Sequence, residues 1–448
     1  MKKPSSMGSA RVKRAHARWC RVRGRSHTRR RKEREGSMRD ERVRALATTA
    51  GTLVGFGHLT SEAIAAVESL SVRLGSPVRC IVEWNRVVLV DLDGLAHTTV
   101  HVRPEAINMA RVNATLRAID SLPSAENIDE REIARLNSRL DDAASIAHAP
   151  LWLFILACIA GAWGLALIYG ARSPLSYVLM AIAAGVGGVL RRWLGSHGIA
   201  VPGQALAAAM LAGILGGVAD HLGIASTARL VAVCPAMILV PGPHLINGAL
   251  DVTGKNVTVG WHRLVYGGII LAAISGGLVV GLLLVGSDLP VTAGARTPSL
   301  WVDALAAALA AMAFSVYFSM PLTQAAWPIL VGGIIHAGRW ILMVVCGVNV
   351  INGDLAACIL AGLVLSAVAH RKRLSFAGVG FAAIVALVPG IYLFRAVAGM
   401  VQLTTRPNTV VVVGVAQDFS TALLILAAMT FGLILSHGFI MRWRAVAR

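Results

Sequence analysis

The chain has 448 residues, of which 56% are hydrophobic and only 15% are charged, and its mean hydropathy is +0.67. These values exclude a soluble globular protein of this length, because repeated apolar runs of about 18 or more residues indicate transmembrane helices. The formal net charge is +19, and residues 1–37 contribute much of it, with 14 Lys or Arg against two Glu.

Residues 1–37 are predicted to be a basic, disordered tail. They are rich in Arg, Ser and Gly and lack the apolar side chains that a core requires. No apolar stretch follows, so the segment is not a secretory signal. Three interpretations are open: a tail on anionic lipid headgroups, a nucleic-acid arm, or translation from upstream of a natural start at Met38. Trp19 alone interleaves the charges as an aromatic, which argues against nucleic acid as a partner.

No metal, disulfide or nucleotide chemistry is indicated by the motifs. The chain has no Walker sequence, so ATP-driven pumping is not expected. The six cysteines lack C-x-x-C spacing, so we expect no disulfide framework, no zinc site and no cofactor. They stand at positions 20, 80, 158, 234, 346 and 358.

Residues 38–148 are predicted to form a small cytoplasmic α+β domain. It has neither a Gly-rich phosphate loop nor a run of parallel strands, which argues against a nucleotide-binding fold. The elements expected along it are helices over 43–75, strands over 78–90 and 98–102, a helix from Pro104, and an amphipathic helix over 124–148.

Ten membrane spans are predicted from Pro150 onwards. Five fall in residues 149–290 and five in 291–448, so the predicted fold is a polytopic α-helical membrane protein with two five-helix repeats after an α+β domain. The spans lie near residues 150–170, 175–194, 199–220, 228–250, 262–286, 299–320, 326–347, 353–370, 374–398 and 417–440.

The distribution of Lys and Arg among the short loops predicts the orientation, because loops rich in Lys and Arg are typically cytoplasmic. With the N-terminal domain in the cytoplasm, ten basic residues fall in loops on that side and four on the other. We therefore expect a multi-pass protein of the cell (inner or plasma) membrane with both termini in the cytoplasm. The ten are Arg191, Arg192, Lys255, Arg263, Arg371, Lys372, Arg373, Arg442, Arg444 and Arg448, and the four are Arg172, Arg229, Arg296 and Arg406.

A Val-Pro-Gly sequence interrupts the fourth span of each half. Pro241 and Gly242 lie in ILVPGPHLIN, and Pro389 and Gly390 lie in ALVPGIYLFR, 148 residues later. Because proline removes a backbone donor and clashes with the carbonyl four residues back, each helix is expected to break and to free carbonyls there. In hydrocarbon such groups must face protein or water. Paired interruptions therefore predict a transporter's substrate site, with packing kinks as the alternative.

The odd number of spans per half predicts that the two repeats are inverted. The second half then enters the membrane from the opposite face, and an axis in the membrane plane relates the two. On this interpretation both interruptions open onto one shared central chamber.

Polar residues after the first interruption are candidates for substrate and proton binding. His244, Asn247 and Asp251 stand at i, i+3 and i+7 and so share one helical face. That face could bind a zwitterionic or anionic solute, with His244 as a proton carrier near neutral pH. Alternatively, His244 bonds to the freed carbonyls and Asp251 is only interfacial.

The second half offers a different set of charged groups. Arg339 is a charge near the middle of its span and requires a partner, for which Asp303 is the nearest candidate and Asp354 is another. A structural Arg–Asp pair is one interpretation, and a bidentate grip on a substrate carboxylate is the other. Tyr392 follows the second Pro-Gly as His244 follows the first, and His336 lies one turn from Arg339.

The sequence resembles the threonine/serine exporter family over most of residues 40–440. The resemblance rests on Ala50-Gly51, Gly57 with Thr60, Gly75, RPEAINMARVNATLRAI from Arg103 to Ile119, ILVPGPHLINGALDV and ALVPGIYLFRAVAGM. It implies secondary export of threonine and serine driven by the proton gradient, in a family whose members also export small carboxylates. Leu59 and Ile64 stand where the family carries acidic residues, and Leu116 where it tends to have Asn, so hydrolytic activity of the N-terminal domain is not expected.

The predicted function is a proton-coupled secondary exporter of threonine, serine or a similar small polar solute, and not an enzyme. Export of a small carboxylate such as a dicarboxylate, or hydrolysis by the N-terminal domain, are the alternatives, and a homo-oligomer is left open. The predicted substrate-binding residues are Pro241, Gly242, His244, Asn247, Pro389, Gly390, Tyr392 and Arg339. The predicted proton-coupling residues are His244, Asp251, Asp303 and His336, with no catalytic residue and no metal ligand.

Overall fold

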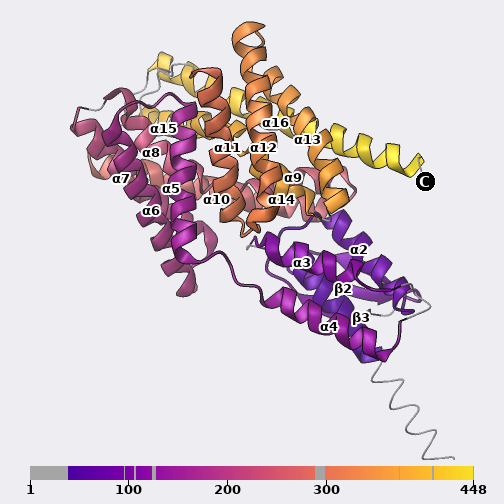
Figure 1. Ribbon diagram of the computed structural model, residues 1–448. Helices are drawn as coiled ribbons and strands as arrows, with labels where there is room; N and C mark the ends of the chain where they lie inside the picture. The colour runs from indigo at the N-terminus through magenta and orange to yellow at the C-terminus, as the bar shows by residue number, and fades with distance from the viewer. Residues whose placement is uncertain are drawn as a thin grey trace, which may run out of the picture.

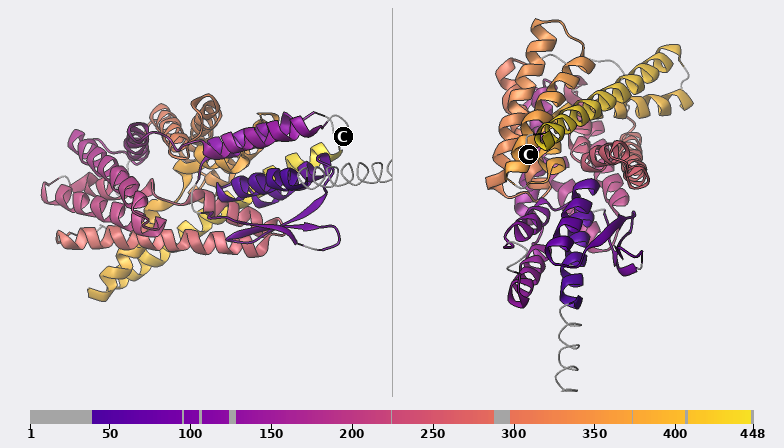
Figure 2. Two further views of the ribbon diagram at one scale, coloured as in Figure 1. Left: turned by 90° about the horizontal axis from the view of Figure 1, so that it is seen from below. Right: turned by 90° about the vertical axis from the view of Figure 1, so that its right-hand side faces the viewer.

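The computed structural model describes residues 39–94, 96–104, 107–123, 128–223, 225–287, 298–372, 374–405 and 408–446. The basic tail predicted over 1–37 lies outside them. Figure 1 shows a helical bundle with a smaller region of helices and strands at one end. Figure 2, right, shows the same arrangement, with the long C-terminal helix running obliquely across the bundle.

The N-terminal region is built from four helices and one antiparallel sheet of order β1-β2-β3. Residues 39–55 form its first helix. The elements that follow are α2 (Thr60–Arg73), β1 (Val78–Val82), β2 (Arg86–Asp91), β3 (Ala96–His101), α3 (Met109–Asp120) and α4 (Glu130–Ser145).

The strand predicted over 78–90 is in fact two strands. Glu83 and Asn85 interrupt the apolar run, and the Glu83 N–H donates to the Arg86 carbonyl at 2.8 Å, which closes a turn between β1 and β2. The helix predicted from Pro104 begins at Met109 instead. Asn108 is its N-cap, and its side chain accepts from the Arg111 N–H at 3.2 Å.

This region has its own apolar core. Leu46, Leu53 and Leu70 from the first two helices pack with Leu89 of the sheet and Ile133 of α4, all fully buried. The core is a cluster separate from the much larger one in the membrane helices. A second core of this kind stabilises the N-terminal region by burial of its own apolar surface.

In the part of the chain that the structure describes, eight uninterrupted helices are long and apolar enough to cross a membrane. Two further helix pairs are bent at a short break and bring the total to ten when each pair counts as one span. All ten predicted spans correspond to one of these units. The helices are α5 (Leu151–Ile168), α6 (Pro174–Ser196), α7 (Val201–His221), α8 (Ala225–Met237), α9 (Gly242–Thr253), α10 (Val257–Leu284), α11 (Leu300–Tyr317), α12 (Leu322–Trp340), α13 (Val350–Lys372), α14 (Phe376–Ile384), α15 (Gly390–Thr405) and α16 (Thr409–Val446).

Helices recur in the same order at nearly constant spacing. Helix α6 begins at Pro174 and α12 at Leu322, 148 residues later, and the same interval separates the starts of α9 and α15. For α5 and α11, and for α7 and α13, the interval is 149 residues. The interval between the two Val-Pro-Gly sequences therefore extends to whole helices.

Helices α7 and α10 pack backbone to backbone through glycines. A Cβ on Gly277 of α10 would overlap the Leu206 carbonyl oxygen of α7, and one on Gly281 would overlap that of Met210. In the other direction, a Cβ on Gly213 of α7 would overlap the Leu278 carbonyl oxygen. Membrane helices associate through such close approach because lipid provides no hydrophobic drive between them.

We predict that Gly277→Ala destabilises the protein by about 1–3 kcal/mol, because a backbone oxygen cannot move aside as a side chain can. Gly276→Ala is the matched control, since nothing lies within 4 Å of a Cβ there. Denaturant titration of each purified variant in micelles measures the difference. Equal stability of the two variants would contradict this packing.

Candidate functional site

Each Val-Pro-Gly sequence bends its helix sharply. The first break separates α8 from α9, which are inclined by 53°. The second break separates a short 3-10 turn after α14, Val385–Leu387, from α15, with a bend of 60°. Both predicted interruptions are therefore present.

The two breaks have the same backbone hydrogen bonds. In the first, the Val240 N–H donates to the Met237 carbonyl (3.3 Å), and the Gly242 N–H donates to Val240 (2.9 Å). In the second, Val388 donates to Val385 (3.2 Å), and Gly390 donates to Val388 (2.8 Å). The expectation that proline frees backbone carbonyls is wrong for Met237 and Val385, because each of these carbonyls accepts from the N–H three residues on.

The breaks also pack against each other's helices. A Cβ on Gly242 would overlap the ring of Phe381 in α14, and a Cβ on Gly390 would lie 2.9 Å from the Met237 side chain at the end of α8. Glycine at both positions lets the two bent helices touch where they change direction. The breaks therefore meet in packed protein and not in an open space.

A first cavity of about 400 Å³ lies beside the first break. Its wall includes Pro241 and His244, the start of α5 at Phe154, the end of α11 at Tyr317, and His148 from the segment before α5. Its volume is in the range of small-molecule pockets, about 300–1,000 Å³.

A second, smaller cavity of about 160 Å³ lies beside the second break. Pro389 and Tyr392 line it together with Asp303 near the start of α11, Arg339 of α12 and Tyr169 after the end of α5. Helices α5 and α11 thus reach one cavity with one end and the other cavity with the opposite end. The shared central chamber expected from the sequence is replaced by two separate cavities.

Arg339 and its two predicted partners, Asp354 and Asp303, belong to two separate ion pairs. Arg339 is hydrogen-bonded through Nε to Asp354 of α13. Asp303 instead pairs with His336, at 3.0 Å between its carboxylate and Nδ1. Asp303, His336 and Asp354 are all buried. Of the two candidates that the sequence left open for Arg339, the structure selects Asp354.

The predicted face of His244, Asn247 and Asp251 divides between two environments. His244 lines the first cavity and packs edge-on against the Tyr266 ring, with centroids 5.3 Å apart. Asn247 points to the N-terminal region, where its amide donates to the Gly57 carbonyl at 2.9 Å. These residues therefore join the cavity to the N-terminal region.

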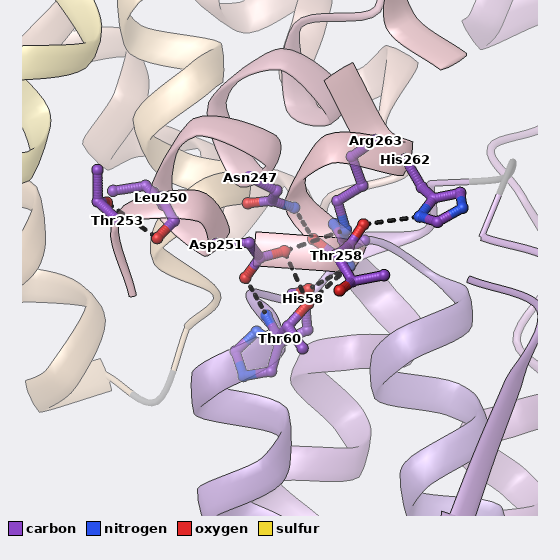
Figure 3. Close-up of polar contacts among 10 residues, drawn as sticks. His58, Thr60, Asn247, Leu250, Asp251, Thr253, Thr258, His262 and Arg263 are labelled. Carbon is purple, nitrogen blue, oxygen red and sulfur yellow. Dashed lines mark hydrogen bonds and ion pairs between the residues drawn. The ribbon is translucent and has the colours of Figure 1, made fainter. Parts of the chain in front are cut away.

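Asp251 caps a helix of the N-terminal region from across the interface (Figure 3). Its carboxylate accepts from the Thr60 N–H at 3.2 Å and from the Thr60 hydroxyl at 2.7 Å, at the start of α2. Leu59, the N-cap residue, has no side chain that could do this. Arg263 of α10 completes the group with Nε 3.3 Å from Asp251, and both side chains are at most 2% exposed.

A third cavity of about 510 Å³ separates α2 from the ends of α13 and α16. Glu62 of α2 has carboxylate oxygens 3.5 Å from His58 Nε2 and 3.8 Å from His437 Nε2. The Nδ1 atoms of the two histidines hydrogen-bond with Ser375 and Ser366, respectively. Within the described part of the chain, no three or more His, Cys, Asp or Glu residues are grouped so as to hold a metal ion.

Burial changes the protonation of this cluster on the N-terminal side. It raises the pKa of Glu62 to about 7. It lowers the pKa of His58 to about 3, an effect to which the nearby Arg263 charge adds. The folded protein therefore favours the neutral form of both side chains.

Sequence reasoning missed the cationic wall of the first cavity. Arg191 and Arg192 line it at the end of α6, although they were assigned only to a loop. One signal was available, because Arg191 precedes Arg339 by the same 148 residues that separate the Pro-Gly pairs. Tyr169 and Tyr317 are separated by that interval too.

The helices and paired breaks define a multi-pass α-helical membrane protein. The chain belongs to the threonine/serine exporter family, since residues 44–285 match the family model of that name and residues 303–439 match a second threonine/serine exporter model. The family inferred from the sequence is confirmed. No curated protein and no solved structure matches the chain.

We predict that Arg263→Met destabilises the protein by about 3–5 kcal/mol, because it leaves the Asp251 carboxylate buried without a counter-charge. Arg86→Met is the matched control, as its ion pair with Glu83 is about half exposed and its loss should have no measurable effect. Denaturant titration in micelles compares the two. A small effect of Arg263→Met would show that the buried pair does not stabilise the interface.

The pH dependence of stability should reveal Glu62. Its folded-state pKa lies above the ordinary 4.5, so its stabilising effect is complete below pH 4.5 and is lost as the pH rises through about 7. Glu62→Gln should therefore raise the unfolding temperature at pH 8, corresponding to about 1–3 kcal/mol, and raise it much less at pH 5.

The wild type and Glu62→Gln are compared at the same pH, so that the pH-dependent contribution of His58 to stability is present in both. That contribution has the opposite pH dependence, because it is lost as the pH falls from 6.5 towards 3. Glu130→Gln on the exposed start of α4 serves as the control. Thermal unfolding followed by tryptophan fluorescence measures both. A gain at pH 5 equal to that at pH 8 would contradict the raised pKa.

Proposed function

We propose that this protein is a secondary active exporter of small polar amino acids, threonine and serine, coupled to protons. The observation that carries the proposal is the pair of Pro-Gly breaks with the same hydrogen bonds, each beside its own cavity. A carrier that alternates between two faces requires a binding region reachable from each face in turn. The two cavities, one beside each break, are proposed to be the two access routes.

The two halves, residues 149–290 and 291–448, are proposed to be inverted repeats. Five spans in each half would place the equivalent helices in opposite directions. The constant helix spacing and the matching break geometry support this proposal. The excess of Lys and Arg on the side of residues 38–148 supports an N-terminal region and C-terminus in the cytoplasm, so that the first cavity faces the cytoplasm.

Proton coupling is proposed to involve one group at each cavity. His244 lines the first cavity, and the buried Asp303–His336 pair lies at the second. Ionisable groups at membrane depth are costly to bury and are therefore candidates for proton transfer. Asp251 is engaged by Thr60 and Arg263, so its contribution to coupling is proposed to pass through the N-terminal region.

A small carboxylate is the second candidate solute. The first cavity is lined by Arg191, Arg192, His148 and His244, and none of the described residues that line it is Asp or Glu. A wall of this charge favours an anion. An amino acid supplies a carboxylate as well, and a dicarboxylate supplies two, so the cavity accommodates either class.

Counterflow with purified full-length protein in liposomes tests the proposal. Labelled threonine and serine should accumulate against preloaded unlabelled substrate, with succinate in the same panel as the alternative. A pH gradient should drive net flux in the wild type, and His244→Ala should remove this pH dependence while exchange persists.

His262→Ala is the matched control for that variant, because this histidine lies on the neighbouring helix α10 and is exposed. Succinate movement without threonine or serine would replace the amino-acid proposal by the carboxylate one. No movement of any solute would exclude export, and unchanged pH dependence in His244→Ala would remove that histidine from the coupling.

A further inference from the structure

Three arginines in the membrane helices are paired with aspartates. Arg263, Arg339 and Arg395 are each at most 18% exposed, and they pair with Asp251, Asp354 and Asp418, respectively. Each pair removes the cost of holding an isolated charge away from water. A half-buried cation at a cavity wall without such a partner is therefore informative.

Arg191 is without a carboxylate partner among the described residues. Its Nη1 donates to the Tyr317 hydroxyl, and its guanidinium lies 5.2 Å from the centre of that ring. Its Nε is buried and has no hydrogen-bond acceptor in the described part of the chain. The guanidinium thus retains donors at the wall of the first cavity.

Neighbouring cations add to the positive charge. Arg192 lines the same cavity, donates to the Ala149 carbonyl at 2.9 Å and lies over the Phe154 ring. It is held in place by these contacts and also faces no carboxylate among the described residues. The cavity therefore has two guanidinium groups, and the described residues that line it include no Asp or Glu to neutralise them.

The second cavity shows what an equivalent arginine binds. Arg339 stands 148 residues after Arg191, and Tyr169 stands 148 residues before Tyr317, so each arginine shares its cavity with a tyrosine of the other half. Arg339 holds the carboxylate of Asp354. Helices α7 and α13 are offset by 149 residues, so the position equivalent to Asp354 in the first half is Ala205, which provides no carboxylate.

We infer that Arg191 and Tyr317 form an anion site that takes the carboxylate of the exported solute, an inference that rests on the proposed function. The planar guanidinium presents two parallel N–H groups that match a carboxylate. The Tyr317 hydroxyl accepts from Arg191 and keeps its own hydrogen to donate to a carboxylate oxygen. In this structure the first cavity is open to a solute, while Asp354 occupies the corresponding place in the second.

Binding, measured separately from transport, tests the site. Purified full-length protein is titrated with L-threonine, with succinate and with threoninol, which lacks the carboxylate, and thermal unfolding reports binding. The wild type should be stabilised by threonine, by succinate or by both, and not by threoninol. Arg191→Gln should weaken carboxylate binding at least about tenfold, the loss of one charge-assisted hydrogen bond.

Three further variants define the result. Arg191→Lys keeps the charge but lacks the two parallel N–H groups of the guanidinium, so it should bind carboxylates with intermediate affinity. This variant also tests the site if Arg191→Gln does not fold. Tyr317→Phe removes one donor and should weaken binding by about three- to tenfold. Arg172→Gln is the charge-matched control before the start of α6, where the side chain is exposed, and should bind as the wild type does.

The binding and counterflow results together distinguish failure of the anion site from failure of the export proposal. Unchanged carboxylate affinity in folded Arg191→Gln or Arg191→Lys overturns the anion site, as does a wild type that none of the carboxylates stabilises. Carboxylate binding that depends on Arg191, combined with no counterflow of any solute, supports the anion site and overturns the export proposal instead.

Discussion

The contact between the two bent helices is the constraint on which the arrangement of the membrane part depends. Gly242 leaves room for the Phe381 ring, and Gly390 leaves room for Met237. Side chains at these glycines would force the helices apart at the points where their direction changes. Because the breaks touch, polar backbone at the bends is enclosed by protein, as a membrane interior requires, and the space beside them is divided into two cavities.

Charge pairing explains much of the remaining polar architecture. Aspartates neutralise three arginines that would be costly if isolated. Arg191 and Arg192 at the first cavity differ from these three, because no aspartate among the described residues pairs with them. On the proposed anion site, the arginines at the first cavity would differ from the three paired ones in having no protein carboxylate among the described residues.

Side-chain hydrogen bonds connect the N-terminal region to the membrane helices. Asp251 caps α2, and the Asn113 side chain accepts from the Ser375 N–H at 3.1 Å and donates to Gln324 at 2.6 Å. Ile107 and His148, from this side, belong to the wall of the first cavity. The region therefore contributes to the cavity itself and is more than an attached domain.

Local chemistry in the sequence determined the spans, the two interruptions and the family. An apolar run of sufficient length and a proline inside a helix have the same consequence wherever they fold, so the eight uninterrupted candidate spans and both bent helix pairs could be predicted. The start of the helix at Met109 and the division of the strand were harder to predict, because each depends on a single hydrogen bond, from the Arg111 N–H to the Asn108 side chain and from the Glu83 N–H to the Arg86 carbonyl.

Only the tertiary structure decided which side chains meet. Asp354 and not Asp303 holds Arg339, Thr60 binds a carboxylate 191 residues away, and Arg191 lines a cavity although it resembles an ordinary loop charge. Pairing and burial depend on how segments distant in sequence pack together. Hydropathy and spacing describe one segment at a time, so they specify the helices but not the partners.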